Sequence, residues 1–326
     1  MIRGLFAISV WCGAMALAVS APARAAVPPG AGEPLRPLVA IQGLDPGKAA
    51  LGRRLFFDPI LSADGSISCQ SCHDLSKGGS DHRARSIGIH GARGAVRAPT
   101  VFNAALNVAQ FWDGRAATLE DQVSGPVTNP LEMGSTWPGL LRRLAAAPDY
   151  AAAFRRLYGH GPDKASVSDA IATFERGLIT VNSRFDAYLL GDDNALNDNE
   201  RKGYALFKSY GCASCHQGAN VGGNMYQKFG FVGDYWGRKV HLTTADLGRF
   251  NVTGLARDRY VFKVPSLRLA TVNGPYFHDG SVPSLEEAIR LMGRYQLGQT
   301  IPDGDIHLII AFLGSLVGDT SVGSAP

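Results

Sequence analysis

The pentapeptide Cys-x-x-Cys-His occurs twice in this chain, at residues 69–73 and 212–216. The chain has only 5 Cys and 8 His in 326 residues, so two such matches are not expected by chance. A zinc site would need two further ligands at compact spacing, and none stands near either motif. The pattern is typical of haem attachment, with thioether bonds to both cysteines and the histidine as axial iron ligand. The sequence therefore predicts two haem c groups, attached to the residues Cys69, Cys72, Cys212 and Cys215, with His73 and His216 on the irons.

The fifth cysteine, Cys12, lies in an N-terminal segment that is typical of a secretory signal peptide, residues 1–25. Arg3 supplies the positive start, residues 5–19 are apolar, and Ala23-Arg-Ala25 resembles a cleavage site. The apolar run is too short for an ordinary membrane anchor, and no other stretch approaches a membrane span. Export together with c-type haem predicts a periplasmic protein.

The charges of the chain are nearly balanced. Its 32 basic and 28 acidic residues give a net charge of +4 and are spread along the sequence. A nucleic-acid surface would show a dense basic run, and the sequence has none. We therefore expect no nucleic-acid partner.

An internal duplication surrounds the two motifs. Residues 99–120 align without gaps on residues 265–286 and share Phe-x-Asp-Gly and a closing Leu-Glu. The second copy has a longer segment between motif and repeat, and the insertion is expected within residues 220–250. The duplication predicts two haem domains, over residues 26–190 and 191–326, which follow the signal peptide at residues 1–25.

Apolar residues recur at helical spacing in several segments of both halves. These segments are residues 137–157, 166–181, 284–292 and 303–316. Asn197 and Glu200 have the spacing of a capping box at another helix start. Strand-like alternation is scarce, so the predicted fold class is mainly α, with two cytochrome c-like domains that each hold one covalently bound haem c.

The two halves differ at the positions where a second iron ligand would stand. Met292 follows the second repeat, where it can complete an electron-transferring haem or simply fill a core. The first half has Pro126 at the equivalent position, followed later by Glu132 and Met133. Either Met133 binds the first iron, or Glu132 lies over an open iron as an acid/base. The spacing does not decide between them.

Two further differences concern histidines and a tryptophan. His82 and His90 lie in a loop rich in Gly, Ser and Arg. A histidine there could be a removable ligand of the iron, or it could simply be a surface side chain. Trp112 aligns with His278, and such an aromatic residue serves either packing or an electron route between the haems.

These residues resemble those of the bacterial di-haem cytochrome c peroxidases, and the resemblance runs from about Pro37 to Leu316. The matching segments are Cys69–Ser76 with Gly78-Gly79, Ser86–Gly91, Ala98–Val101, Gln110–Arg115, Leu131–Met133, Gly211–His216, Pro275–His278 and Leu291–Gly293.

The resemblance implies a division of labour between the domains. In the N-terminal, peroxidatic domain, His73 would be the proximal ligand, His90 the distal ligand of the oxidised resting state, and Glu132 the acid/base. In the C-terminal, electron-transfer domain, His216 and Met292 would bind a high-potential haem. Trp112 would lie on the electron path between the haems, and His278 matches a histidine near the second haem.

Two departures from the family pattern bear on these roles. Ile89 stands where the family has its distal histidine, and His90 follows it, with His82 as a weaker rival. If neither histidine reaches the iron, the first haem is open without prior reduction. The family also has an asparagine that gives an oxygen to an interdomain calcium ion, and this chain has Arg97 there. The other calcium ligands would be main-chain carbonyls matching Asn273 and Pro275, but a guanidinium supplies no oxygen.

The resemblance implies reduction of hydrogen peroxide to water with electrons from a periplasmic cytochrome c or cupredoxin, by a homodimer. One alternative is a related di-haem enzyme that oxidises residues of a partner protein; those enzymes have Tyr in place of the Met292 ligand. The other is a non-enzymatic di-haem electron carrier with Met133 on the first iron.

Overall fold

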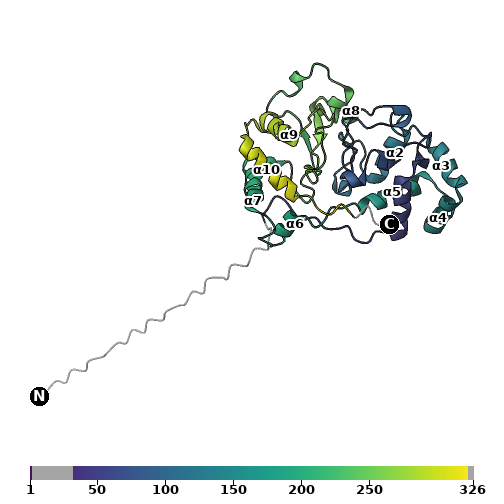
Figure 1. Ribbon diagram of the computed structural model, residues 1–326, viewed down its shortest axis with the longest axis horizontal. Coiled ribbons are helices and arrows are strands. Elements are labelled where there is room, and N and C mark those ends of the chain that lie inside the picture. The colour runs from purple at the N-terminus through teal and green to yellow at the C-terminus, as the bar shows by residue number, and fades with distance from the viewer. Residues whose placement is uncertain (2–31, 322–326) are drawn as a thin grey trace.

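The computed structural model describes Met1 and residues 32–321. The predicted signal peptide, apart from Met1, and with it Cys12, lies outside the described residues. The described chain forms two lobes, with α1 to α5 in one and α7, α9 and α10 in the other (Figure 1).

The helices of the first lobe are α1 (Pro46–Phe57), α2 (Leu119–Thr128), α3 (Trp137–Ala146), α4 (Pro148–Tyr158) and α5 (Lys164–Arg176). The later helices are α6 (Arg184–Leu189), α7 (Asp198–Ser209), α8 (Phe250–Thr253), α9 (Leu285–Leu291), which continues into a π-helix (Met292–Leu297), and α10 (Asp303–Ser315). The only named strands in the described residues are β1 (Tyr226–Lys228) and β2 (Val261–Lys263), so the prediction of a mainly α protein is confirmed.

The helix start predicted at Asn197 is confirmed, and the predicted helical segment 137–157 is divided. The Asn197 side chain accepts from the Glu200 N–H at 3.0 Å, and the Glu200 carboxylate accepts from the Asn197 N–H at 2.9 Å, which completes the capping box. The segment 137–157 is not one helix but two. Ala147 adopts an extended conformation before Pro148, because a proline disfavours helical geometry in the residue that precedes it.

The same helix crossing builds both lobes. A Cβ atom on Gly52 of α1 would lie 1.8 Å from the main-chain oxygen of Ala170 in α5. A Cβ atom on Gly203 of α7 would lie 1.9 Å from the main-chain oxygen of Leu308 in α10. Only glycine allows two helices to approach so closely. In each lobe the helix that leads into the haem motif is thus locked against the lobe's last long helix.

The loops repeat as well. The isolated bridge between Gln110 and Ala116 has a counterpart between Tyr276 and Val282. The next residue in each copy, Phe111 or Phe277, has a positive φ, of 68° and 67° respectively. The predicted duplication is therefore visible in the backbone conformation.

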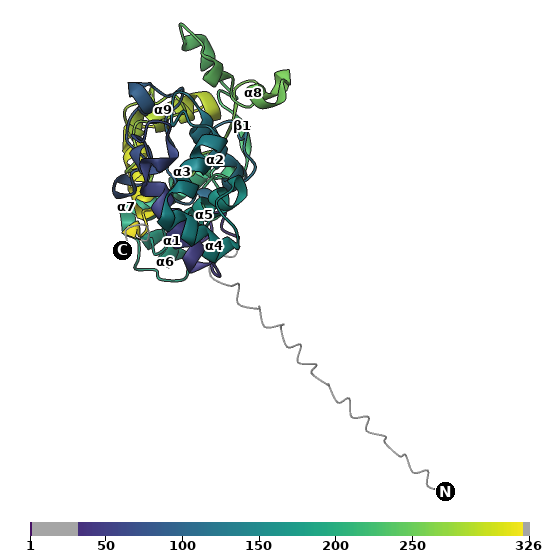
Figure 2. The same cartoon turned by 90° about the vertical axis from the view of Figure 1, so that its right-hand side faces the viewer.

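The predicted insertion extends one edge of the second lobe. β1 pairs with β2 in antiparallel register, with Gln227 opposite Phe262. The segments around this ribbon, including α8, project from the body of the molecule (Figure 2). Trp236 stacks on Tyr260 with ring centroids 4.5 Å apart and anchors the insertion to the chain that follows it.

The packing differs from the predicted boundary between residues 190 and 191. Phe185 and Leu189 of α6 are buried in the core of the second lobe, together with Phe312 of α10. Leu35 from the start of the described chain is buried in the same core. The second lobe therefore includes α6 and also recruits a segment that precedes the first lobe.

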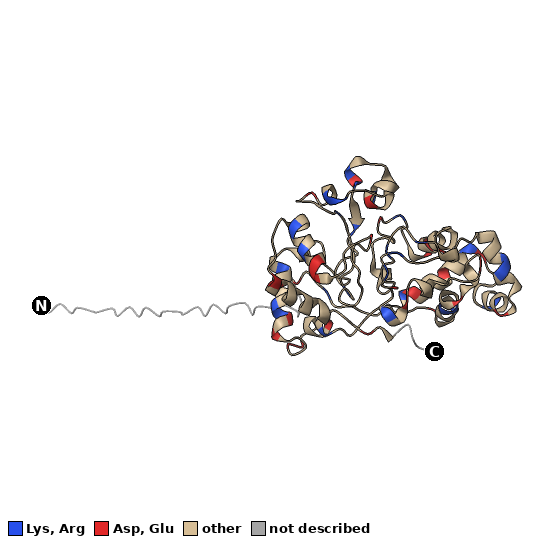
Figure 3. Ribbon diagram, turned by 45° about the horizontal axis from the view of Figure 1, so that its top comes forward, with Lys and Arg blue, Asp and Glu red and all other residues tan. Residues whose placement is uncertain are grey.

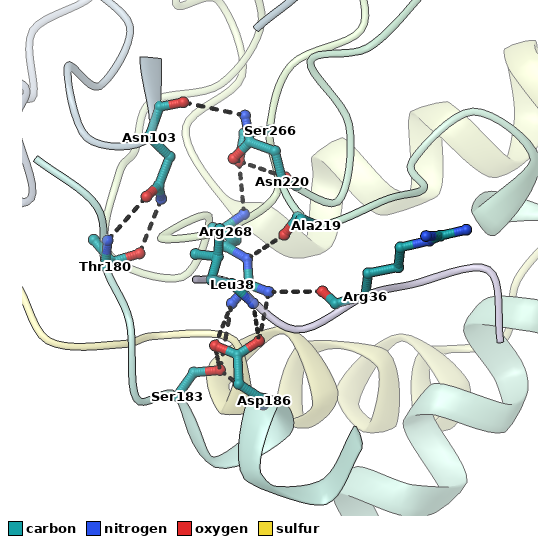
Figure 4. Close-up of polar contacts among 10 residues, drawn as sticks. All are labelled: Arg36, Leu38, Asn103, Thr180, Ser183, Asp186, Ala219, Asn220, Ser266 and Arg268. Carbon is teal, nitrogen blue, oxygen red and sulfur yellow. Dashed lines mark hydrogen bonds and ion pairs between the residues drawn. The ribbon is translucent and has the colours of Figure 1, made fainter. Parts of the chain in front are cut away.

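A buried ion pair fastens this recruited segment. The Arg268 guanidinium donates to Asp186 at 2.7 Å, and the two side chains are 0% and 4% exposed (Figure 4). Asp186 also accepts from the Leu38 N–H, and Arg268 donates to the carbonyl oxygen of Ala219. Arg268 occupies the position that Phe102 has in the first repeat, so the second copy replaces an apolar core contact with a charged one.

Basic and acidic side chains are spread over both lobes (Figure 3). None of the described helices has the length and apolar character that a bilayer crossing requires.

Candidate functional site: two haem cavities

Both Cys-x-x-Cys-His motifs fold into the same turn. Each begins with a short 3₁₀ helix, at residues 69–71 and 212–214. The N–H of His73 donates to the Cys69 carbonyl at 2.9 Å, and the N–H of His216 donates to the Cys212 carbonyl at 3.0 Å. The turn therefore presents both cysteines and the histidine of each motif to a common cavity.

The two motif histidines are oriented by equivalent prolines of the repeat. His73 Nδ1 lies 3.1 Å from the carbonyl oxygen of Pro99, and His216 Nδ1 lies 3.2 Å from that of Pro265. A carbonyl only accepts, so Nδ1 carries the proton and Nε2 is free to bind a metal. Burial lowers the pKa of both imidazoles, that of His216 to about 4, which favours the neutral, ligating form.

The first cavity lies between α2, α5 and the first motif. It has about 560 Å³ of empty space, part of it open to solvent. Its lining is mostly apolar, with polar groups from the motif, from α2 and α5, and from the loop after α2. The main lining residues are Cys69, Cys72, His73, Gln122, Val123, Val127, Glu132, Met133, Ile171 and Glu175.

Glu132 lines the first cavity, and a hydrogen bond fixes the orientation of its carboxylate. Its Oε1 accepts a hydrogen bond of 2.7 Å from the side-chain amide of Asn129. Burial raises the pKa of Glu132, while the Asn129 bond and the charge of Arg115 oppose that rise. A carboxyl group with a raised pKa and a fixed orientation is suited to both accepting and returning a proton.

Met133 lies beside Glu132 but has a structural reason to be there. It is 3% exposed and belongs to the core that also contains Leu61 and Leu140. It lines the first cavity from that core. Packing therefore accounts for its burial without a bond to iron.

The loop that carries His90 is fastened over Glu132. The N–H of Ile89 donates to the main-chain oxygen of Glu132 at 2.8 Å, and the Ile89 side chain is buried. His90 points outward, with its side chain 76% exposed and Nδ1 3.6 Å from an Asp64 carboxylate oxygen. His82 is also exposed and contacts the carbonyl oxygen of Lys77. In this conformation neither His90 nor His82 lines the first cavity.

The second cavity is larger and more apolar. It has about 1760 Å³ of empty space, part of it open to solvent. Cys212, Cys215 and His216 line it, and so does Met292, the first residue of the π-helix that follows α9. Short π-helical segments often occur at functional sites, because they displace a side chain from the regular helical position. The structure thus brings Met292 into one cavity with His216.

Lys263 is a functional candidate that sequence reasoning missed. It lines the second cavity, is 7% exposed, and its ammonium makes no hydrogen bond or ion pair with the described residues. Burial lowers its pKa to about 8. A buried cation without a partner fits an anionic carboxylate edge of a bound haem. The sequence shows only a single Lys within an apolar run there, which does not reveal this orientation.

Glu175 and Gln122 were also missed. Glu175 is 7% exposed and lines the first cavity, and its carboxyl group makes no hydrogen bond with the described residues. Burial and the nearby Glu120 raise its pKa to about 8. Both residues lie on helices that the periodicity treats as packing elements, so no motif signals them.

Trp112 lines the second cavity. Its indole Nε1 donates to the main-chain oxygen of Arg97 at 2.9 Å. The preceding residue, Phe111, lies against Gly125 of α2, where a Cβ atom would come within 2.6 Å of its ring. Other residues of α2 line the first cavity, so Phe111 packs against the helix that forms one wall of that cavity.

His278 lies beside Trp112 in a buried charged cluster. Its Nε2 is 2.8 Å from Asp246 Oδ1, and its ring centroid is 6.5 Å from that of Trp112. Lys239 binds both Asp246 and Asp279, at 2.5 Å and 2.6 Å. These carboxylates could hold a metal ion, but the Lys239 ammonium already supplies the positive charge they require.

The region that would hold calcium contains a guanidinium. Arg97 Nη2 donates to the main-chain oxygen of Asn273 at 2.9 Å. That oxygen is one of the two carbonyls that the family resemblance assigns to the ion. A fixed positive charge stands where an oxygen ligand would be required, so the residues do not fit calcium.

The family model of the di-haem cytochrome c peroxidases matches residues 46–194. The chain is 47% identical over 287 residues to the cytochrome c peroxidase Ccp of Escherichia coli, covering 88% of this chain but 61% of the relative. It is 45% identical over 292 residues to the cytochrome c551 peroxidase of Nitrosomonas europaea, covering 89% of this chain and 85% of the relative. The crystal structure of a MauG-like protein associated with microbial copper homeostasis aligns with a TM-score of 0.77 at 27% identity, covering 95% of this chain and 98% of the other. Together with the two motif cavities, these similarities mean that the cofactors are two covalently bound c-type haems.

Proposed function

This chain belongs to the di-haem cytochrome c peroxidase family, and on that premise we propose that it reduces hydrogen peroxide to water. The observation that carries the proposal is the position of Glu132, which lines the same cavity as His73 and is held there by Asn129. When bound, the haems supply the redox chemistry at their irons. The protein supplies orientation, proton transfer and a path between the two cavities.

In the first cavity the protein's task is to move protons. Splitting the O–O bond requires a proton to leave one peroxide oxygen and reach the other. The ionised Glu132 carboxylate accepts the first proton, and its protonated form returns it to the departing oxygen. Two electrons and two protons from outside then complete the conversion of one peroxide molecule to two water molecules. His73 would be the proximal ligand, because its Nδ1 proton is already held by Pro99.

In the second cavity the protein's task is to receive and pass on electrons. His216 and Met292 would ligate the second iron, and a Met ligand raises the potential of a haem. We assign entry of electrons to this domain, from a small periplasmic cytochrome c or cupredoxin. Trp112 would then connect the cavities, in line with its contact to the second cavity and the contact of Phe111 with α2.

His90 needs a loop movement to act as a distal ligand. For its ring to enter the first cavity, the hydrogen bond from the Ile89 N–H to the main-chain oxygen of Glu132 would have to break. The contact between His90 and the Asp64 carboxylate would be lost as well. We therefore propose that the conformation described here is the peroxide-accessible one. In this conformation the first haem would bind peroxide without a preceding reduction step. Binding of His90 to the iron would require a second conformation of the loop.

The rival functions make different demands on the same residues. An enzyme that oxidises a partner protein would have Tyr in place of Met292, so Met292 favours a peroxidase. A simple electron carrier would need Met133 on the first iron, and the packing of Met133 in the core gives no support for that bond. Export to the periplasm and a homodimer are part of the proposal.

The test is a steady-state assay with hydrogen peroxide and a reduced small cytochrome c, combined with spectra of the half-reduced protein. A peroxidase consumes peroxide and changes its spectrum when peroxide is added to the half-reduced form. A carrier keeps both irons six-coordinate and shows neither effect, and that result would refute the proposal.

A further inference from the structure

Arg97 forms the centre of the seam between the two lobes. It is 5% exposed, and its guanidinium donates to the main-chain oxygens of Asn273 at 2.9 Å and Gly274 at 3.4 Å. On the side of the first lobe it donates to Ser80 Oγ at 3.3 Å. It forms no ion pair with an acidic residue among the described residues. Carbonyl and hydroxyl oxygens therefore surround this cation much as they would surround a metal ion.

The main chain of Arg97 holds two further residues. Its N–H donates to the carbonyl oxygen of His278 at 2.8 Å, and its own carbonyl oxygen accepts the indole N–H of Trp112 at 2.9 Å. A single residue thus fixes the loop 273–278 of the second lobe and the orientation of the Trp112 ring. Both bonds are made by the main chain of Arg97, and the guanidinium bonds to Asn273 and Gly274 help to hold that main chain in place.

A guanidinium is suited to this position. It is planar, always charged, and has five N–H donors in a rigid fork. Buried carbonyl oxygens need donors, and the single nitrogen Nη2 donates to those of both Asn273 and Gly274. A calcium ion at the same place would meet a like charge at short range, and the side chain would offer it no ligand.

Arg97 also lines the second cavity, and its Nε has no hydrogen-bond partner among the described residues. Its charge therefore acts on the seam and on the cavity that receives the second haem.

We propose that Arg97 is the built-in cation of the interdomain seam, which replaces a calcium ion and positions Trp112 beside the second haem. The positioning of Trp112 as an electron path rests on the proposed function; the replacement of calcium does not.

The experiment uses the full-length, haem-loaded protein in three forms. Wild type, Arg97→Gln and Arg97→Lys are compared with Arg93→Gln, a matched control that removes an exposed arginine from the same loop. Thermal unfolding is measured in excess EDTA and in excess calcium. The potential of the second haem is measured by spectroelectrochemical titration, and the rate of electron transfer between the haems by stopped flow.

We expect wild type and Arg93→Gln to unfold at the same temperature in EDTA and in calcium. Arg97→Gln should unfold at a lower temperature, lower the potential of the second haem and slow interhaem transfer severalfold, with Arg97→Lys restoring the potential at least in part. A wild-type protein that loses thermal stability in EDTA and regains it with calcium would overturn the proposal, even if the variants fail to fold. An Arg97→Gln protein with unchanged potential and transfer rate would overturn it as well. Absence of peroxide turnover in wild type would refute the proposed function and leave the chelation result standing.

Discussion

Asn129 holds the carboxylate of Glu132 through a hydrogen bond of 2.7 Å from its side-chain amide nitrogen to Oε1. Asn129 ends α2, and its own side-chain oxygen accepts the N–H of Leu131 at 3.0 Å. The helix end therefore sets both the path of the loop and the direction of the acid that the loop carries. This relationship makes the proton-transfer role of Glu132 testable in two separate ways.

Replacing Glu132 by Gln should abolish most peroxide turnover while both haem spectra stay unchanged. The amide keeps the volume and the bond to Asn129 but cannot take a proton, and positioned acid/base groups contribute about 10²- to 10⁴-fold to rate. Steady-state assays check this, with Asp121→Asn, an exposed acid on α2, as the matched control. Unchanged turnover would remove Glu132 from the mechanism.

Replacing Asn129 by Ala should shift the pH profile instead of abolishing activity. The Asn129 bond stabilises the ionised form of Glu132, so its loss raises the pKa of that carboxyl further. The acidic limb of the pH–rate profile should therefore move to higher pH. A profile that keeps its position would mean that the bond does not act on the reacting carboxylate.

Replacing Met292 by Ala should lower the potential of one haem and leave the other unchanged. A Met ligand raises haem potential, so its loss makes the second haem a poorer electron acceptor. Turnover with a reduced cytochrome c should fall, and spectroelectrochemistry should show a single shifted potential. Met225→Leu outside the second cavity is the control, and two unchanged potentials would exclude Met292 as a ligand.

Replacing Lys263 by Met should lower the potential of the second haem, on the order of tens of millivolts. A nearby positive charge favours the reduced iron, which has one positive charge fewer. The exposed Lys202 in α7 provides the control variant, Lys202→Met. Equal potentials in both variants would show that the Lys263 ammonium does not act on the haem.

Glu175 makes the stability of the protein depend on pH. Its pKa is raised to about 8, so the folded protein keeps a proton that the unfolded chain releases above about pH 4.5. Stability from this group is fully present below pH 4.5 and is lost as the pH rises toward 8. Glu175→Gln should therefore gain thermal stability over wild type between pH 5 and pH 8, by an amount on the order of a few kcal/mol at most. Glu287→Gln, at an exposed glutamate, should show no such trend.

Much of the functional layout could be predicted from local sequence. The two motifs, the repeat and the Asn197–Glu200 capping box depend on residues close together in the chain, and the structure preserves each of them. Met292 could be singled out because it follows the second copy of the repeat, in the half of the chain that contains the second haem motif. The spacing of apolar residues predicted helical structure over residues 137–157 but did not show the break before Pro148.

The missed features depend on contacts between distant segments. Arg97 meets Asn273 only after loops of both lobes have packed together, and Lys239 meets Asp279 only after two distant loops of the second lobe have done so. The recruitment of Leu35 into the second core places an early segment beside a late one. Periodicity and motif spacing do not predict such long-range contacts, because these contacts depend on which loops face one another in the fold.

Because each lobe has its own close helix crossing, at Gly52 or Gly203, the packing of one lobe can be disrupted without altering the crossing in the other. A single added methyl group at either glycine would force apart one pair of helices, while the other crossing and its motif would keep their geometry. Gly52→Ala and Gly203→Ala therefore offer a way to obtain molecules with one intact haem lobe each, in which peroxide binding and electron acceptance can be observed in isolation.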